Sequence, residues 1–226
     1  MIEIRIDNEV IVRWQGEAAL GFCVLGGLGT GDPGPRFQEE IEGAQADAAT
    51  VSADDLIVAA VRATFRSMPD MDPTRYRPAS EALIRRVAEK GLVHIHPLVD
   101  LNNRLSIRYR IPLGIYDLGR VEGVRWDYRL GRAGEAYTTI GGQTKSAAGK
   151  LVLTDADGVI GSPVADAGRA PVGPQTCRIV VIAYLPFGTS ESSAATVTAA
   201  VEAAFVENFA AAPEGRGVVC IPRPAS

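Results

Sequence analysis

The residues that could carry metal or nucleophilic chemistry in this chain are few and widely spaced. His94 and His96 are the only histidines, and no third histidine or cysteine cluster is present to complete a metal site beside them. We therefore expect surface or structural histidines, and we expect no metal and no cofactor. Cys23, Cys177 and Cys220 lie far apart without a Cys-x-x-Cys pair, which predicts buried thiols. Because no Gly-x-Ser-x-Gly elbow occurs, a serine hydrolase is also disfavoured.

Two short loops look like ligand-binding motifs but lack essential positions. Residues 26–31 are rich in glycine, yet they have neither the G-x-G-x-x-G spacing nor the Lys-Ser/Thr pair of a phosphate-binding loop. Residues 154–158 begin like a calcium loop, but no glutamate follows at the twelfth position. The Asp157-Gly158 pair favours a hairpin turn instead.

The distribution of charge is more informative than its total of −4. From Arg75 to Arg132 the chain has twelve basic and six acidic residues, a balance of +6, whereas the remainder has eleven basic and twenty-one acidic residues, a balance of −10. A basic segment between acidic flanks is what a polyanion-binding face requires. Solvated arginines on an ordinary surface would give the same pattern, so the charge alone leaves both interpretations open.

Length and composition predict one folded domain over residues 1–226. The chain is 46% apolar and 22% charged, which is typical of globular proteins. No apolar run approaches the roughly 20 residues needed to cross a bilayer, and residues 1–7 alternate charged and apolar types, unlike a secretory signal. We therefore expect a cytoplasmic protein with no membrane partner.

Hydrophobic periodicity predicts an α/β or α+β fold with a mixed β-sheet flanked by helices. Strands are expected at residues 2–6, 10–14, 19–25, 121–129, 150–154, 178–185 and 217–221, with the first two forming a hairpin or bent strand. Helices are expected at residues 37–47, 56–65, 78–90, 97–109 and 197–209. Ser52 is the expected N-cap before the second helix, and strand 121–129 is expected to expose a basic face.

Three blocks of sequence occur in a recognisable order within the basic segment. They are residues 76–86 with the pair Arg85-Arg86, residues 99–103 (Val-Asp-Leu-Asn-Asn), and residues 112–118 (Pro-Leu-Gly-Ile-Tyr-Asp-Leu). Together they resemble the B3/B4 domain of the bacterial phenylalanyl-tRNA synthetase β subunit, and more closely the free-standing proteins built from that domain alone. The resemblance is densest from residue 76 to 129 and continues more weakly to residue 184.

This resemblance implies a tRNA-binding protein that hydrolyses mischarged aminoacyl-tRNA in trans, because within the synthetase the domain removes wrongly attached tyrosine. Asn103 falls on the asparagine that lines the family's editing pocket, and Asn102 stands where threonine is common, so both are the implied catalytic residues. Gly114 replaces a pocket histidine, and residues 179–183 lack the glutamate that reads the tyrosine hydroxyl. The resemblance thus implies weak preference for tyrosine over phenylalanine.

The same residues also make chemical sense without the family. An ester on a ribose hydroxyl is labile, so its hydrolysis needs chiefly a pocket, an oriented water and donors for the oxyanion. Asparagine amides can supply such donors, although Asn103 could instead buttress the loop before Pro112. Asp100 and Asp117 are expected to pin backbone N–H groups at a helix end or turn.

The predicted partner is the acceptor end of tRNA or an aminoacyl ester. The predicted substrate-binding residues are Gly114, Tyr116, Arg77, Arg85, Arg86, Arg104 and Arg108. The alternative is a catalytically silent RNA-binding or small-ligand-binding module with the same fold. A pocket at Asn102 and Asn103 that opens onto the arginines favours the enzyme, whereas an occluded cleft or a remote basic face favours the module.

Overall fold

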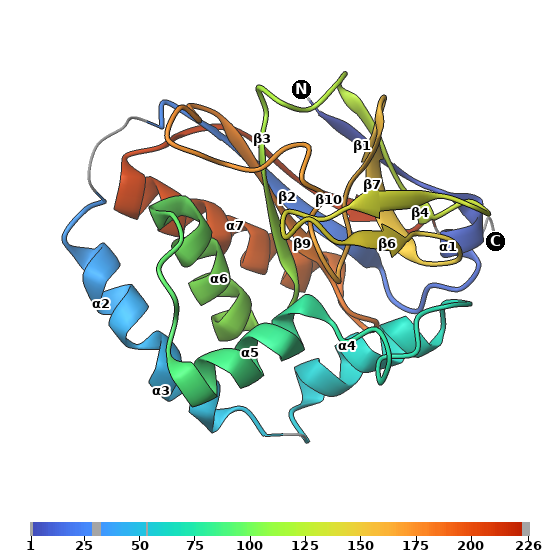
Figure 1. The fold of residues 1–226 in the computed structure, drawn as a ribbon, viewed down its shortest axis with the longest axis horizontal. Coiled ribbons are helices and arrows are strands. Elements are labelled where there is room, and N and C mark those ends of the chain that lie inside the picture. Colours follow the sequence, from blue (N-terminus) through green and yellow to red (C-terminus); the bar gives the residue numbers. More distant parts are fainter. Residues whose placement is uncertain (1, 29–32, 53, 223–226) are drawn as a thin grey trace.

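A computed structural model describes residues 2–28, 33–52 and 54–222, in which two four-stranded β-sheets pack together beside a group of helices (Figure 1). The strands are β1 (Glu3–Ile6), β2 (Ala18–Gly26), β3 (Leu113–Asp117), β4 (Arg125–Leu130), β5 (Ala136–Thr138), β6 (Thr144–Ser146), β7 (Leu151–Asp155), β8 (Gly158–Gly161), β9 (Ile179–Tyr184) and β10 (Ala212–Cys220). One sheet has the order β10-β2-β9-β3 and is antiparallel. The other has the order β1-β4-β7-β8, with β1 parallel to β4 and the remaining pairs antiparallel. The predicted α/β class with mixed strand pairing is confirmed.

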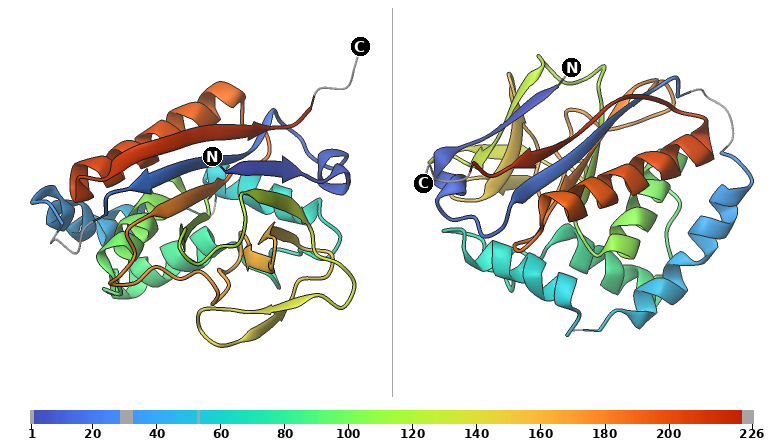
Figure 2. Two further views of the ribbon diagram at one scale, coloured as in Figure 1. Left: turned by 90° about the horizontal axis from the view of Figure 1, so that it is seen from above. Right: turned by 180° about the vertical axis from the view of Figure 1, so that it is seen from behind.

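The helices are α1 (Asn8–Ile11), α2 (Arg36–Glu42), α3 (Ala44–Thr50), α4 (Leu56–Arg66), α5 (Ala79–Lys90), α6 (Pro97–Tyr109) and α7 (Glu191–Phe209). Helix α7 packs along β2 and β10, as the two views in Figure 2 show, and α6 packs against β3 and α7. Helix α5 contacts both α3 and α6, so α6 lies between the sheet and the outer helices. None of the helices in the described residues is long and apolar enough to span a membrane.

The two faces of the β10-β2-β9-β3 sheet pack against different layers. On one face, Gly21 lets α7 approach closely, because a Cβ at this position would collide with the Thr198 side chain. On the other face, Tyr184 packs against Tyr128 of the second sheet with ring centroids 5.9 Å apart. These tyrosine rings are fully buried, and each contributes about 1.5–3 kcal/mol of hydrophobic stabilisation. Successive side chains along β3 and β9 therefore point alternately toward the second sheet and toward the helices.

The first segment differs from its prediction, because residues 8–11 form α1 rather than a second strand. Asp7 caps this helix by accepting a hydrogen bond from the Glu9 N–H at 2.9 Å. The N-terminal strand is consequently not part of a hairpin, and it pairs in parallel with β4. A local cap outweighed the β propensity of two valines and an isoleucine in residues 10–12.

Some helix boundaries agree with their predictions and others differ, including that of α7, which begins at Glu191 although residue 197 was predicted. Pro78 is the N-cap of α5, Gly91 ends this helix with φ +75°, and Pro97 opens α6, in agreement with the predicted ranges 78–90 and 97–109 to within one residue. The N-cap of α4 is Asp55 rather than Ser52, because the Asp55 carboxylate accepts the N–H groups of the first helical turn at 3.0 and 3.1 Å. The predicted helix at residues 37–47 is divided into α2 and α3.

The cysteines are not all buried, in contrast to their prediction. Cys23 is buried in β2, and this burial raises the pKa of its thiol to about 12. Cys177 and Cys220 are exposed. Residues 29–31 of the glycine-rich stretch at 26–31 lie outside the described residues.

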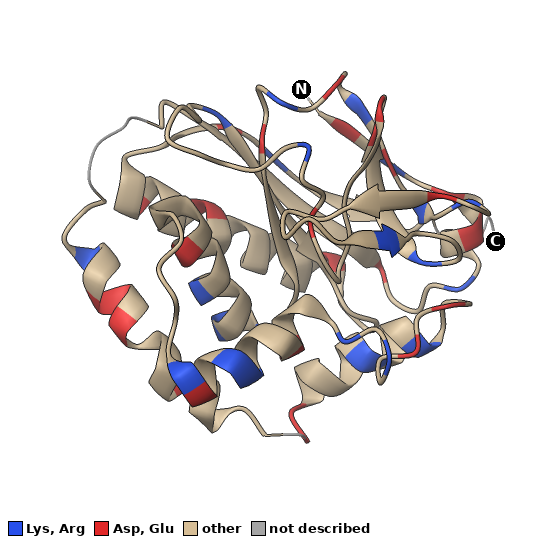
Figure 3. Ribbon diagram, in the orientation of Figure 1, with Lys and Arg blue, Asp and Glu red and all other residues tan. Residues whose placement is uncertain are grey.

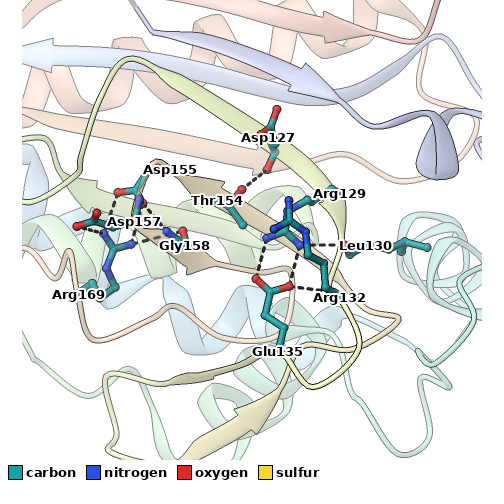
Figure 4. Close-up of polar contacts among 10 residues, drawn as sticks. All are labelled: Asp127, Arg129, Leu130, Arg132, Glu135, Thr154, Asp155, Asp157, Gly158 and Arg169. Carbon is teal, nitrogen blue, oxygen red and sulfur yellow. Dashed lines mark hydrogen bonds and ion pairs between the residues drawn. The ribbon is translucent and has the colours of Figure 1, made fainter.

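The second sheet is fixed at one end by an acidic hairpin turn (Figure 4). Asp155 accepts hydrogen bonds from the N–H groups of Asp157 and Gly158 at 2.9 and 3.1 Å. Arg169 completes the turn by donating to both oxygens of Asp155, at 2.9 and 3.1 Å. The predicted hairpin turn at residues 154–158 is confirmed, and Arg169 supplies the charge that balances its buried carboxylate.

Strand β4 exposes less positive charge than the alternating pattern predicted. Arg125 is exposed, but Arg129 is buried and donates to both carboxylate oxygens of Glu135 at 2.8 and 2.7 Å (Figure 4). The neighbouring Asp127 is acidic and exposed. The outer face of β4 is therefore not a basic surface.

Candidate functional site

A cleft of about 720 Å³ lies between α5, α6, strand β3 and the segment 162–174. This volume is within the range of about 300–1,000 Å³ that small-molecule sites occupy. Its walls are mostly apolar, and they include Leu83, Ile95, Val99, Leu113, Ile115, Ile140, Val164 and Val172. The polar side chains in its lining are Arg86, His96, Asn102, Asn103, Ser106 and Asp166. A few polar groups in an apolar cleft are typical of sites that orient a small ligand.

Asn102 is held in place between α6 and the sheet. It is only 3% exposed, and its Nδ2 donates to the Leu113 carbonyl oxygen at 3.1 Å. Its Oδ1 is buried and accepts no hydrogen bond from the described residues. Since an unmet buried acceptor costs about 1–3 kcal/mol, Asn102 offers a favourable acceptor to a donor that enters the cleft.

Asn103 is placed differently from its neighbour. It is half-buried in the cleft lining, and within residues 2–28, 33–52 and 54–222 its side chain forms no hydrogen bond. The loop before Pro112 is instead fixed by Ser106, whose hydroxyl donates to the Ile111 carbonyl at 2.6 Å. The buttressing role considered for Asn103 is thus filled by Ser106 and Asn102, which leaves the Asn103 amide available to a ligand.

Asp166 is a cleft residue that the sequence did not indicate. Its Oδ1 accepts a hydrogen bond from the Tyr116 hydroxyl at 2.6 Å, and that hydroxyl is also 2.8 Å from the Tyr184 hydroxyl. Burial raises the pKa of Asp166 to about 7, while the hydrogen bond from Tyr116 opposes this rise. A positioned carboxylate that titrates near neutral pH is suited to general base chemistry.

The contact that positions Asp166 joins residues 50 apart in sequence, so no local spacing could reveal it. It also bears on an expectation about the pocket. Residues 179–183 carry no carboxylate, as read from the sequence, but the cleft still contains one because segment 162–174 supplies Asp166. The expected weak discrimination between tyrosine and phenylalanine rested on the glutamate missing from residues 179–183, and it stays a prediction.

His96 combines a structural role with a place in the cleft. Its Nδ1 accepts the Leu98 N–H at 3.3 Å and so caps the first turn of α6. A ring nitrogen that accepts is unprotonated in a neutral imidazole, so the proton lies on Nε2 as a donor. The predicted structural role is confirmed, and His96 also lines the cleft.

The two aspartates of the sequence blocks have the structural roles predicted for them. Asp100 is 1% exposed, contacts His94 through Oδ2, and accepts the Ile95 N–H through Oδ1 at 3.0 Å. Asp117 accepts the Gly119 N–H at 2.8 Å and the Thr176 hydroxyl at 2.7 Å. Both carboxylates are committed to shaping the walls of the cleft rather than to its chemistry.

Gly114 and Tyr116 point away from the cleft. Leu113 and Ile115 line the cleft. Gly114 and Tyr116 alternate with them along β3 and therefore face the opposite side of the sheet. There a Cβ at Gly114 or at Gly161 would collide with the Tyr116 hydroxyl. Gly114 therefore makes room for the tyrosine that holds Asp166, and neither Gly114 nor Tyr116 lines the cleft as predicted for substrate-binding residues.

Arg86 is the one residue among the five predicted arginines that lines the cleft, and it forms no ion pair within the described residues. The remaining four are neutralised by nearby carboxylates, at 3.4 Å for Arg77 with Glu81, 3.3 Å for Arg85 with Glu89, 2.7 Å for Arg104 with Asp47 and 3.2 Å for Arg108 with Glu40. Figure 3 shows this mixture of acidic and basic residues along the helices. The field at the cleft is accordingly weaker than the charge of the segment suggested.

Arg104 in particular is a structural residue. Its side chain is 8% exposed and contacts Asp47 at 2.7 Å and the Glu40 carbonyl oxygen at 2.6 Å, which ties α6 to α2 and α3. We expect Arg104→Ala to lower the free energy of unfolding by about 1–3 kcal/mol, because it removes a buried guanidinium together with its ion pair to Asp47 and its hydrogen bond to the Glu40 carbonyl oxygen. Urea unfolding checks this. Arg108→Ala, which removes an exposed pair, should cost less than about 1 kcal/mol, and equal losses for the two variants would contradict the assignment.

Comparison with known proteins agrees with the sequence blocks. The B3/4 domain family matches residues 63–209, and the chain belongs to this family. It is 32% identical over 104 residues to the phenylalanine–tRNA ligase β subunit of Lactiplantibacillus plantarum, a stretch that covers 44% of this chain and 13% of that protein. The chain thus spans a small part of this relative.

A solved structure also resembles the chain, namely an N-terminal fragment of the phenylalanyl-tRNA synthetase β subunit from Pyrococcus horikoshii. It has a TM-score of 0.45 and 10% sequence identity, and the match covers 93% of this chain and 49% of the fragment. The resemblance to the synthetase β subunit that the sequence blocks indicated is confirmed by the family match.

Proposed function

We propose that this protein binds the aminoacylated end of tRNA and hydrolyses the ester of a mischarged amino acid in trans. The observation that carries the proposal is the cleft itself, in which Asn102, Asn103 and Asp166 share one largely apolar hollow with Arg86. The apolar walls suit an amino-acid side chain, and Arg86 suits a phosphate of the nucleic acid. The relationship to the synthetase β subunit supports RNA as the partner.

In the proposed reaction, the Asp166 carboxylate takes a proton from water as the water oxygen attacks the ester carbonyl carbon. The Asn103 amide and the His96 Nε2–H donate to the oxygen that becomes negative in the tetrahedral intermediate. When the bond to the ribose oxygen breaks, protonated Asp166 returns its proton to that leaving oxygen. The sum is one water consumed, with one free amino acid and one uncharged RNA end formed.

A deacylation screen against a panel of mischarged tRNAs tests this function. Hydrolysis of at least one ester above the uncatalysed rate supports the proposal, and its loss in Asp166→Asn locates the activity in the cleft. Absence of hydrolysis on every charged tRNA would overturn it. The second candidate, a binding module without hydrolysis, is favoured by the ion pairing of four of the five predicted arginines.

Binding of tRNA should depend on salt and on Arg86. Each phosphate contact contributes about one unit to the slope of log affinity against log salt, so Arg86→Ala should reduce that slope by about one. Fluorescence anisotropy between about 50 and 200 mM salt measures this. Arg85→Ala is the matched control, since Arg85 is the adjacent arginine but pairs with Glu89 and lies outside the cleft. Salt-independent binding, or equal effects of the two substitutions, would contradict this role for Arg86.

A further inference from the structure

A second, smaller hollow of about 230 Å³ lies beside the cleft, between Tyr76 and strands β6 and β7. Its polar lining consists of Tyr76, Tyr137, Ser146, Lys145, Lys150 and Ser162, together with Thr144, and it contains no carboxylate among the described residues. Val164 lines both this hollow and the cleft, so the two sites share a wall. We call the smaller site the lysine pocket.

Among the residues that the structure describes, the two lysines of this pocket differ from most arginines in having no acidic partner. Neither Lys145 nor Lys150 forms an ion pair within the part of the chain that the structure describes. The carboxylate of Asp70 lies against Gly149 at the edge of this region, yet it pairs with neither lysine. Two uncompensated ammonium groups in a concave site attract an anion.

Lys150 is positioned rather than freely mobile. Its Nζ lies 4.5 Å from the centroid of the Tyr76 ring and donates to the Ala148 carbonyl oxygen at 3.4 Å. An ammonium group has three hydrogens, so these contacts leave donor capacity for a ligand. Arg75 also contacts this ring, with its guanidinium carbon 5.5 Å from the centroid, but Arg75 does not line the pocket.

We propose that the lysine pocket binds a phosphate group, namely a phosphodiester of a single-stranded RNA end whose terminal residue occupies the cleft. Lys145 and Lys150 supply the charge, and the Ser146 and Thr144 hydroxyls supply further donors, since neither makes a side-chain hydrogen bond within the described residues. The choice of RNA as the source of the phosphate rests on the proposed function. The capacity to bind a phosphate rests on the pocket alone.

The test is binding of a fluorescently labelled, single-stranded RNA hexanucleotide that carries no amino acid. Lys145→Ala with Lys150→Ala in one chain should weaken its affinity about tenfold or more at low salt and reduce the salt slope by one to two units, about one per lost contact. Lys90→Ala is the matched control, because Lys90 is exposed, forms no ion pair within the described residues and lies outside the pocket. The affinity of the Lys90→Ala variant for the hexanucleotide should stay within about twofold of the wild type. Thermal unfolding of each variant verifies that it is folded.

Inorganic phosphate, titrated as a competitor, separates the sources of the anion. Displacement of the RNA from wild type, with little effect on the residual binding of the double variant, supports a phosphate site that RNA uses. Phosphate binding without RNA binding would overturn the RNA assignment. Unchanged RNA affinity in the double variant would overturn the phosphate site and leave the deacylase proposal intact. RNA binding that depends on the lysines, without deacylation of any charged tRNA, would overturn the deacylase proposal and leave the phosphate site intact.

Discussion

Asp166→Asn is expected to lower kcat/KM for ester hydrolysis by about 100-fold or more at pH 8, the contribution typical of a general base. The substitution keeps the shape of the side chain, and its carbonyl oxygen can still accept the hydrogen bond from Tyr116. What it removes is the ability to take a proton from water. Asp54→Asn is the control, because Asp54 is an exposed carboxylate remote from the cleft lining.

The same carboxylate predicts how activity depends on pH. A general base works in its deprotonated form, and burial raises the pKa of Asp166 to about 7. Activity of the wild type should therefore fall about tenfold per pH unit below this value and level off above it. Other groups around Asp166 do not obscure this profile on the alkaline side, because burial raises the pKa values of Tyr116, Tyr184 and Tyr137 above their ordinary value. Activity that stays constant from pH 5 to 8 would exclude Asp166 as the base.

A stability measurement checks the Asp166 assignment without relying on activity. Its pKa is higher in the folded chain than the ordinary value near 3.8, so the folded state favours the protonated form. The resulting stabilisation is complete below about pH 4 and is lost as the pH rises through about 7. By pH 8 the wild type should have lost on the order of 2–4 kcal/mol through this group, a loss that Asp166→Asn avoids. If the free energies of unfolding of the wild type and Asp166→Asn changed equally with pH, the raised pKa assigned to Asp166 would be contradicted.

The difference between the asparagines and Asp166 shows what the sequence alone can predict about this site. Asn102 and Asn103 lie in one block on a helix whose period was readable, so their element could be anticipated, but no strand was predicted at residues 113–117, where β3 lies beside them. Asp166 lies in a segment without regular structure, and in the cleft its side chain is held by a hydrogen bond from Tyr116 of β3. Contacts between distant segments depend on how the two sheets pack, which no periodicity encodes.

Charge was the least reliable guide, for a related reason. The sequence sum counts Arg104 and Arg86 equally, but the fold buries Arg104 against Asp47 and leaves Arg86 in the cleft lining. The partners of the paired arginines come both from the same helix and from outside the basic segment, as Glu40 and Asp47 do. The lysines that remain unpaired near the cleft, Lys145 and Lys150, lie after that segment and were not singled out. Net charge along a chain therefore predicts a binding face only where the acidic partners are known.

Asn103→Ala is expected to lower kcat/KM for ester hydrolysis by about 10- to 1000-fold, the range associated with the loss of one oxyanion donor. Since the Asn103 side chain forms no hydrogen bond within the described residues, the free energy of unfolding should change by less than about 0.5 kcal/mol. The effect should appear in kcat rather than in RNA affinity, because the donor acts on charge that develops only in the transition state. Single-turnover deacylation and anisotropy binding measure the two quantities separately.

The neighbouring asparagine provides the contrast that makes this prediction specific. Asn102→Ala removes the hydrogen bond to the Leu113 carbonyl, so it should lower the free energy of unfolding by about 1 kcal/mol or more. Asn103→Asp, by comparison, keeps the size of the side chain but replaces the donor with a negative charge that repels the oxyanion, and it should be at least as inactive as Asn103→Ala. If Asn103→Asp and Asn103→Ala both hydrolyse the ester at the wild-type rate, the oxyanion must be stabilised by His96 or backbone N–H groups, and Asn103 has no part in the chemistry.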